Sequence, residues 1–272
     1  FLLIGIVMTY SSRAIKGYLY YEDPYHYFKA ELIWVALGLI AMTVALMVDC
    51  RWLYQQAKPI LYIAIVLLIM VKIPGIGKTV NGATRWIGMG PLQIQPSEVI
   101  KLAMVLVMAR FLSADPYRIR SFRRGIIPSL VLLGLICGLI MLQPDLGTTL
   151  VIAATVFFML LAIGAKLWHM AGLGCAGIGL LVAAIIAEPY RMRRIFAFLD
   201  PWADPSGKGY QTIQSLLALG PGGLFGLGIG QSRQKFLYLP ENHTDFIFAM
   251  IGEELGFVGA TLVVLLFALF IF

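Results

Sequence analysis

Charged residues are scarce in this sequence. They make up 13% of its 272 residues, whereas hydrophobic residues make up 60%. An ordinary soluble domain is about half apolar and about a quarter charged. The composition therefore excludes a soluble globular fold.

Cysteines are few, and the familiar nucleotide- and metal-binding motifs are missing. The three cysteines are scattered, with no CxxC spacing and no histidine pairing, which excludes a disulfide framework and a zinc site. The sequence contains no Walker loop, GxGxxG, HExxH or DxD-type pair. No internal repeat suggests two inverted halves, which lowers the expectation of a secondary transporter.

Long uncharged runs dominate the chain. Five runs of 17 to 20 residues match the roughly 20 residues that cross a bilayer as a helix: 32–48, 126–142, 146–165, 170–187 and 255–272. Three weaker runs cover 1–10, 59–73 and 96–112. With about eight crossings, we expect an all-α polytopic transmembrane helical bundle that forms one integral-membrane domain over residues 1–272. The chain opens without methionine and stops within an apolar run, so we expect both ends to be truncated.

The net charge is +7, and most basic residues lie between these runs. This placement indicates membrane topology and lipid headgroups rather than nucleic acid. Four arginines crowd the segment 113–125, which predicts that it faces the cytoplasm. Alternation then places 49–58 and 164–169 inside, and 11–31, 72–95, the turn 143–145 and the segment 188–245 outside.

The outer segment 188–245 is 58 residues long, and loops of that length are usually functional or disordered. Its many aromatic residues argue against disorder. The apolar, glycine-rich stretch 213–230 predicts short helices that lie at the interface or dip back into the membrane. We therefore expect a structured extracytoplasmic loop before the last span.

Ionisable residues near spans are costly and are functional candidates. Glu98 and Lys101 lie at the start of a helix that Pro96 opens. They form either a structural ion pair or the lining of an outward-facing polar cavity, where Lys101 meets a phosphate. Asp145, in the turn between two spans, either caps the following helix or joins the substrate-binding residues.

Two further acidic sites lie around the start of the last span. Glu253 and Glu254 point in different directions on a helix, and packing is the preferred interpretation for them over catalysis. Asp245 ends the outer segment at the membrane surface beside a helix N-terminus. It is either a simple N-cap or a general base toward a sugar hydroxyl.

Cations on the outer side suit a pyrophosphate, because guanidinium groups bind phosphate bidentately. The candidates are Arg85, Arg191, Arg193, Arg194, Lys208, Arg233 and Lys235. Outside the cell nucleotide-linked sugar donors are short in supply, so we expect an activated substrate to arrive on a lipid.

Several motifs occur in one order along the chain. They are Asn81-Gly82-Ala83-Thr84-Arg85-Trp86, Gln95-Pro96-Ser97-Glu98 with Lys101, Gln143-Pro144-Asp145-Leu146-Gly147, Phe198-Leu199-Asp200-Pro201, and His243-Thr244-Asp245-Phe246 with Glu253-Glu254-Leu255-Gly256. Together they resemble the SEDS family (shape, elongation, division and sporulation) of multispanning peptidoglycan glycosyltransferases over residues 1–272. Trp202-Ala203-Asp204-Pro205 and Gly230-Gln231-Ser232-Arg233 look more like the branch of FtsW and its sporulation relative than the RodA branch. Thr84 and Pro221 depart from the usual family pattern.

The resemblance implies ten spans and polymerisation of lipid II on the outer face of the bacterial cytoplasmic membrane. It also implies a class B penicillin-binding protein as partner and Asp245 as the essential catalytic residue. The expected substrate-binding residues, from the resemblance and the charge pattern together, are Glu98, Lys101, Arg85, Asp145, Arg194, Lys208, Gln214, Ser215 and His243. The expected ligands are lipid II, undecaprenyl-pyrophosphate-linked glycan and membrane lipids, with no nucleic acid.

We expect an inverting transfer, in which Asp245 removes a proton from the attacking sugar hydroxyl and no covalent enzyme nucleophile is needed. No protein metal site is expected, and the one cofactor considered is a divalent cation, Mg²⁺ or Mn²⁺, at the leaving pyrophosphate. The rival functions are a lipid II flippase and a non-catalytic scaffold of a division or elongation complex. The acidic candidates gather on the outer half, with Asp49 and Asp115 as the inner acids, which argues against a polar path across the membrane.

Overall fold

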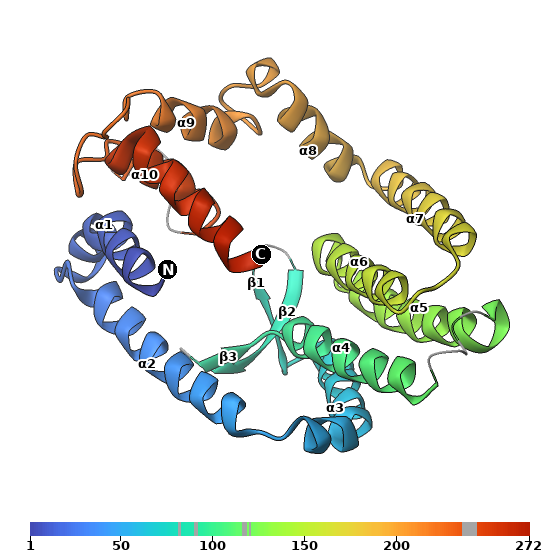
Figure 1. Cartoon of the computed structure of the whole chain (residues 1–272). Coiled ribbons are helices and arrows are strands. Elements are labelled where there is room, and N and C mark those ends of the chain that lie inside the picture. Colours follow the sequence, from blue (N-terminus) through green and yellow to red (C-terminus); the bar gives the residue numbers. More distant parts are fainter. Residues whose placement is uncertain (81–82, 90–91, 116–118, 120, 236–243) are drawn as a thin grey trace. The chain divides into compact units, whose positions relative to one another are not determined.

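The computed structural model describes residues 1–80, 83–89, 92–115, 119, 121–235 and 244–272 (Figure 1). The chain divides into two compact units, one made of residues 47–181 and the other of residues 1–46 with 182–272. Each unit is built mainly from helices that are apolar over much of their length.

Within the described part of the chain, five helices are long and apolar enough to cross a membrane. They are α2 (His26–Met47), α3 (Cys50–Met70), the helix Phe122–Met141 that a π-helical turn (Phe122–Ile126) and α5 (Ile127–Met141) form together, α7 (Leu167–Ile186) and α10 (Ile247–Ile271). α6 (Leu146–Ala162) is apolar but shorter, and α1 (Leu2–Tyr21) and α4 (Pro96–Ala114) carry charged residues. Each of the eight predicted crossings coincides with one of these helices, which confirms the helical polytopic fold class.

The segment 11–31, which the sequence suggested was an outer loop, is mostly helical. α1 continues to Tyr21 and α2 begins at His26, so only a short turn separates them. Asp23 closes this turn by accepting hydrogen bonds from the Lys29 ammonium at 2.8 Å and from the backbone N–H of Tyr25 at 2.9 Å. The Lys29 contact and the backbone bond hold the pKa of Asp23 below its ordinary value. The apolar run ends at residue 10, but α1 continues to Tyr21. Hydropathy therefore marked only the first half of this helix, because the charged residues that follow are also helical.

α3 also begins earlier than the apolar run 59–73 indicated. Asp49 is its N-cap, and the carboxylate accepts a hydrogen bond from the backbone N–H of Arg51 at 2.8 Å. Pro59 lies inside the helix. A helix start signalled by a capping residue therefore precedes the apolar stretch by about two turns.

A small antiparallel sheet replaces the loop expected at 72–95. It consists of β1 (Gly77–Val80), β2 (Ala83–Met89) and β3 (Leu92–Ile94), in the order β1-β2-β3. Gly77 pairs with Ile87, and Ile87 pairs in turn with Ile94 on the other side. A Cβ at position 77 would collide with the carbonyl oxygen of Val71, so the close approach of α3 to the sheet requires glycine there. The sheet lies directly before α4, and β2 contacts this helix.

The unit of residues 47–181 has its core between α3, α4, α5 and α6. The buried residues at the α3–α4 contact are Leu61, Ala64 and Leu68 of α3, and Ile100, Ala103, Met104 and Met108 of α4. Their spacing of three and four residues places each set on one helix face. Ala64 and Ala103 are fully buried, and such small residues let helix backbones approach closely in an apolar environment.

The other unit contains α1, α8 (Pro189–Leu199), α9 (Tyr210–Leu219) and α10. Met8 of α1 packs against Met250 and Ile251 of α10, and Ala218 of α9 packs against Ala249. Figure 1 shows α9 beside the first turns of α10. The described part of the long outer segment thus contains two α-helices and a short 3-10 helix (Pro201–Ala203), and it is structured as expected. Of the stretch 213–230, in which short helices were expected, only the part to Leu219 is helical, in α9.

α10 is interrupted at Gly256, which has a φ of 70° and a ψ of −168°. This break removes the helical partners of two carbonyl groups and two N–H groups, and the loop 222–228 replaces all four. The bonds run from Leu227 N–H to Glu253 O (3.0 Å), Gly228 N–H to Glu254 O (3.0 Å), Phe257 N–H to Gly223 O (2.9 Å) and Val258 N–H to Leu224 O (3.1 Å). These four backbone groups are therefore hydrogen-bonded inside the protein, as an interrupted membrane helix requires.

Candidate functional site

Glu98 and Lys101 form an ion pair in the first turn of α4. Their N–O distance is 2.8 Å, and the side chains are 57% and 34% exposed, respectively. Pro96 stands in the first turn, and Glu98 lies where the helix dipole favours negative charge. The predicted pair is present, and its partly exposed position leaves Lys101 accessible to an anionic ligand.

Arg85 of β2 is bound to the turn between α5 and α6. Its Nε donates to the carbonyl oxygen of Gln143 at 3.0 Å, and its Nη2 donates to that of Pro144 at 2.6 Å. Asp145 lies 3.9 Å from Nη1. The guanidinium thereby connects the sheet to the turn, and the substrate-binding role expected for Arg85 stays a prediction.

Asp145 caps α6, which is one of the two roles considered for it. Its Oδ1 accepts a hydrogen bond from Thr148 N–H at 3.1 Å, and its Oδ2 accepts one from the Thr148 hydroxyl at 2.9 Å. The residue is buried. A carboxylate with both oxygens used in this way acts first as a helix cap, and a contact with substrate stays a prediction.

Arg194 and Lys208 line one hollow of about 370 Å³ in the other unit. The remaining lining residues are Tyr190, Ser206, Gly207, Tyr210 and Gln211. Arg191 holds one wall, because its Nε donates to the Tyr190 hydroxyl at 3.1 Å while its Nη1 donates to the carbonyl of Ala184 at 2.7 Å. The hollow thus combines two cations with hydroxyl and amide groups, which suits a phosphate.

The turn that carries Lys208 is shaped by Asp204. The Asp204 carboxylate accepts a hydrogen bond from Lys208 N–H at 3.0 Å. A Cβ at Gly207 would collide with that carboxylate, so a larger residue there would displace the Asp204 side chain. Sequence reasoning identified the two cations of the hollow but missed Ser206, Tyr210 and Gln211, since nothing in their spacing signals a common site.

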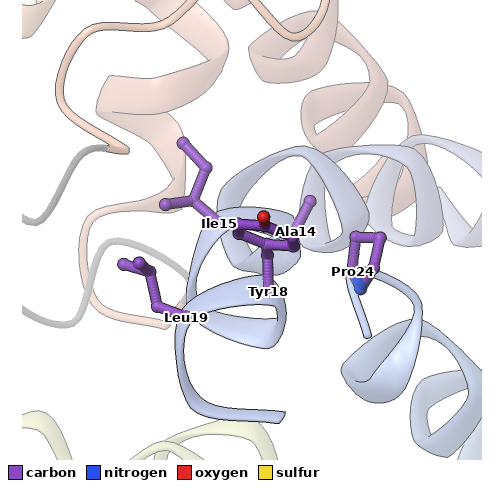
Figure 2. A pocket seen from close by; sticks show the side chains of 5 residues that line it. All are labelled: Ala14, Ile15, Tyr18, Leu19 and Pro24. Atoms are coloured by element: carbon purple, nitrogen blue, oxygen red, sulfur yellow. The ribbon is translucent and has the colours of Figure 1, made fainter. Parts of the chain in front are cut away.

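A second hollow, of about 410 Å³, is apolar. It lies at the end of α1 and is lined by Ala14, Ile15, Tyr18, Leu19 and Pro24 (Figure 2). None of these side chains carries a charge, so this hollow offers nothing to a phosphate.

Asp245 is exposed and lies immediately before Phe246, the N-cap residue of α10. No capping hydrogen bond from a side chain is found at Phe246. An exposed carboxylate at the start of a helix is free to accept a proton from a bound hydroxyl. Asp245 belongs to the same unit as Arg194 and Lys208.

Glu253 and Glu254 are buried, with exposed fractions of 1% and 0%. Glu253 accepts hydrogen bonds from the Ser232 hydroxyl and from Arg233 N–H, and Glu254 accepts one from the Ser11 hydroxyl at 2.6 Å. The preference for packing over catalysis agrees with this burial. The partners of the two carboxylates, however, are polar and specific.

The remaining predicted residues are distributed as follows. Gln214 and Ser215 lie half-buried on α9 outside the hollow, and the Ser215 hydroxyl donates to the Thr212 carbonyl at 2.8 Å. Arg233 is exposed beside Ser232. His243 lies outside the residues that the structure describes.

The described residues offer no cage for the divalent cation considered above. No group of three or more His, Cys, Asp or Glu side chains lies together among them. Mg²⁺ usually keeps several waters and binds through one or two carboxylates plus substrate phosphates. The divalent cation considered at the leaving pyrophosphate would be held in this way by the substrate, and it stays a prediction.

The family model of FtsW, RodA and SpoVE, described as "Cell cycle protein", matches residues 1–272. Stage V sporulation protein E of Bacillus subtilis (strain 168) is 47% identical over 268 residues, covering 98% of this chain and 73% of that protein. A probable peptidoglycan glycosyltransferase FtsW of Aliivibrio salmonicida (strain LFI1238) is 43% identical, covering 98% of this chain and 67% of that protein. The chain belongs to the FtsW/RodA/SpoVE family.

Solved structures agree with this assignment. One, described as "Structural coordination of polymerization and crosslinking by a peptidoglycan synthase complex", matches with a TM-score of 0.70 and 29% identity, covering 98% of this chain and 74% of that one. The rod shape determining protein RodA of Thermus thermophilus matches with a TM-score of 0.60 and 27% identity, covering 98% and 71%. The identities with SpoVE and FtsW exceed that with RodA, in line with the branch that the motifs indicated.

Proposed function

We propose that this chain polymerises lipid II on the outer face of the cytoplasmic membrane, with Asp245 as the general base. Its relatives in several bacteria are named probable peptidoglycan glycosyltransferase FtsW. The chain is a peptidoglycan glycosyltransferase of this family and a multi-pass membrane protein. The substrate, the base and the side of the membrane are our proposals.

The proposed reaction is a single displacement. Asp245 takes the proton of the 4-hydroxyl of GlcNAc in the incoming lipid II. That oxygen forms a bond to C1 of the MurNAc at the lipid-linked end of the growing strand, and the bond from C1 to the pyrophosphate breaks. An α-linked pyrophosphate thus becomes a β-1,4 glycan and undecaprenyl pyrophosphate leaves. One base and stabilisation of the leaving group are sufficient for this step.

The observation that carries the proposal is the hollow shared by Arg194 and Lys208. Two cations that line one polar hollow can meet the charge on a pyrophosphate, and the surrounding hydroxyl and amide groups can bind its oxygens. The exposed Asp245 carboxylate lies in the same unit and is the base that the family motif indicates. Lys101, in the other unit, is a further cation open to an anionic ligand.

A partner enzyme is part of the proposal. The structural relative with a TM-score of 0.70 comes from work on a peptidoglycan synthase complex that coordinates polymerisation and crosslinking. We propose a class B penicillin-binding protein as the corresponding partner of this chain, which would cross-link the strands that the chain forms.

The test measures glycan strands made from purified lipid II in liposomes. The proteins are the full-length wild type and Asp245→Asn, each with its cognate penicillin-binding protein carrying an inactivated transpeptidase site. The matched control is Asp49→Asn, the same exchange at the start of α3, where an amide oxygen caps equally well. We expect strands from wild type and Asp49→Asn and none from Asp245→Asn.

The other outcomes decide between functions. Equal polymer from wild type and Asp245→Asn would show that Asp245 is not the base. If no variant makes polymer while lipid II still crosses the bilayer, the flippase function replaces the polymerase. If lipid II neither reacts nor crosses while the partner still binds, the chain is a scaffold.

A further inference from the structure

Glu253 connects the start of α10, which Asp245 directly precedes, to residues 232–233. Its carboxylate accepts a hydrogen bond from the Ser232 hydroxyl and, at 2.8 Å, one from the backbone N–H of Arg233. Ser232 precedes Glu253 by 21 residues, and Asp245 lies between them. The carboxylate therefore joins residues 232–233 to the first turns of α10.

The backbone around Glu253 is fixed as well. Its carbonyl oxygen accepts the Leu227 N–H at 3.0 Å, at the point where Gly256 interrupts α10. The loop 222–228 is thus hydrogen-bonded along the same stretch of helix that the Glu253 side chain connects to Ser232. Side chain and main chain of one residue together hold the glycine-rich loop, residues 232–233 and the first turns of α10.

A carboxylate is a costly choice for packing alone. Glu253 is 1% exposed and Ser232 is 0% exposed, so both polar groups have left water. Burial of such groups is tolerated when they are hydrogen-bonded, but apolar residues of similar volume usually pack at least as well. What the buried pair supplies is a defined geometry between two segments that are distant in the sequence.

The neighbouring acid provides a natural comparison. Glu254 is also buried, but its Oε1 accepts from the Ser11 hydroxyl of α1, which lies outside the segment 232–253. Loss of the Ser11 hydroxyl removes one buried hydrogen bond from the same part of α10. It leaves the connection between Ser232 and Glu253 intact.

We propose that Glu253 is a positioning residue. By binding Ser232 and the Arg233 backbone it holds the first turns of α10 and, with them, Asp245, which lies directly before this helix. The inference rests on the proposed function, because it assigns Glu253 to the placement of the proposed base. Small displacements of a catalytic group can reduce a rate about a hundredfold, even when the change lies far from the chemistry.

The experiment compares Ser232→Ala, Ser232→Thr and Ser11→Ala in full-length protein with its partner, using lipid II polymerisation kinetics. We expect Ser232→Ala to lower kcat at least about tenfold and to leave KM within about twofold, because positioning acts on the chemical step. Ser232→Thr keeps a hydroxyl and should restore kcat to within about threefold of wild type. Ser11→Ala should keep kcat within about twofold, although it also loses one buried hydrogen bond.

A second measurement does not depend on activity. Trypsin cleaves after Arg233, whose backbone N–H binds Glu253, and after Lys235, two residues further along the chain. We expect faster cleavage there in Ser232→Ala than in Ser11→Ala, with Ser232→Thr like wild type. If Ser232→Ala does not fold, Ser232→Thr must still match wild type in both cleavage and kcat.

Three outcomes would overturn the positioning role. They are equal losses of kcat in Ser232→Ala and Ser11→Ala, a change confined to KM, and a Ser232→Thr variant as impaired as Ser232→Ala. Wild type and Asp245→Asn are measured in parallel. An inactive wild type would refute the proposed function instead, so the two failures are distinguishable.

Discussion

Arg85 and Pro144 are joined by a hydrogen bond of 2.6 Å, although 59 residues separate them in the sequence. The same guanidinium donates from Nε to the carbonyl oxygen of the preceding residue, Gln143. Two nitrogens of one planar group thus bind two consecutive carbonyl groups. The Arg85 guanidinium thus fixes the turn between α5 and α6 through a bidentate hydrogen bond, which a lysine ammonium cannot reproduce.

Arg85→Lys should destabilise the protein by about 1–3 kcal/mol, because carbonyl groups at the turn lose a charged donor. Arg110 provides the matched control, since its Nη1 alone donates to the carbonyl oxygens of Tyr54 and Gln55 at 2.8 and 2.9 Å. A single ammonium can replace a single nitrogen, so Arg110→Lys should change stability by less than about 1 kcal/mol. Thermal unfolding in detergent measures the stability of both variants. Equal losses of stability in Arg85→Lys and Arg110→Lys would show that the bidentate geometry of Arg85 is not needed.

Several local features of the site could be predicted from the sequence because they depend on neighbouring residues. Pro96, Glu98 and Lys101 define a helix start and an i, i+3 pair, and the structure contains both. The role of Asp145 as an N-cap also follows from the sequence, because an aspartate lies directly before an apolar run. Such features need only the helical repeat and the capping preference of carboxylates.

Long-range features could not be predicted. Nothing in the run 255–272 marks Gly256 as a break, since a single glycine is tolerated in a helix. The four hydrogen bonds that replace the helical ones come from the loop 222–228, which lies about 30 residues earlier. The sheet at 77–94 was missed for a related reason, because its strands are short and depend on pairing with one another.

Lys101→Gln should separate the two interpretations of the Glu98–Lys101 pair. The pair is partly exposed, so its loss should cost less than about 1 kcal/mol and shift the unfolding midpoint by less than about 4 °C. If Lys101 meets a substrate phosphate, polymerisation should fall at least about tenfold at the same time.

Lys29→Gln is the control for this exchange, because Lys29 and Asp23 form an ion pair of the same 2.8 Å length with side chains 67% and 36% exposed. It should leave both stability and polymerisation near wild type. A large fall in the unfolding midpoint of Lys101→Gln, with activity reduced in proportion, would mean that the pair is structural.

Gly226→Ala should prevent the loop 222–228 from docking on α10. Gly226 has a φ of 82°, and a Cβ there would collide with the carbonyl group of Glu254. We expect a loss of about 3 kcal/mol or more, or no folded protein at all. Gly223→Ala is the control, since Gly223 has a φ of 52° but open space around it, and it should cost about 1 kcal/mol from backbone strain alone. The monodisperse fraction and unfolding midpoint in detergent measure the difference, and similar behaviour of both variants would argue against the collision.

The double variant Arg194→Gln/Lys208→Gln tests whether the hollow binds a pyrophosphate. Both cations line it, so their loss should raise the KM for lipid II about tenfold or more and change kcat less. Inorganic pyrophosphate should inhibit the wild type and should inhibit the double variant far less.

Lys166→Gln is the control for the double variant, because it removes an exposed cation outside the hollow. It should retain wild-type KM and pyrophosphate inhibition. The phosphate that binds in the hollow could also belong to a headgroup of the surrounding lipid, so the assay is repeated in liposomes with and without phosphatidylglycerol. An effect of the double variant that appears only with phosphatidylglycerol would assign the hollow to a membrane headgroup, and unchanged KM and inhibition would exclude it as an anion site.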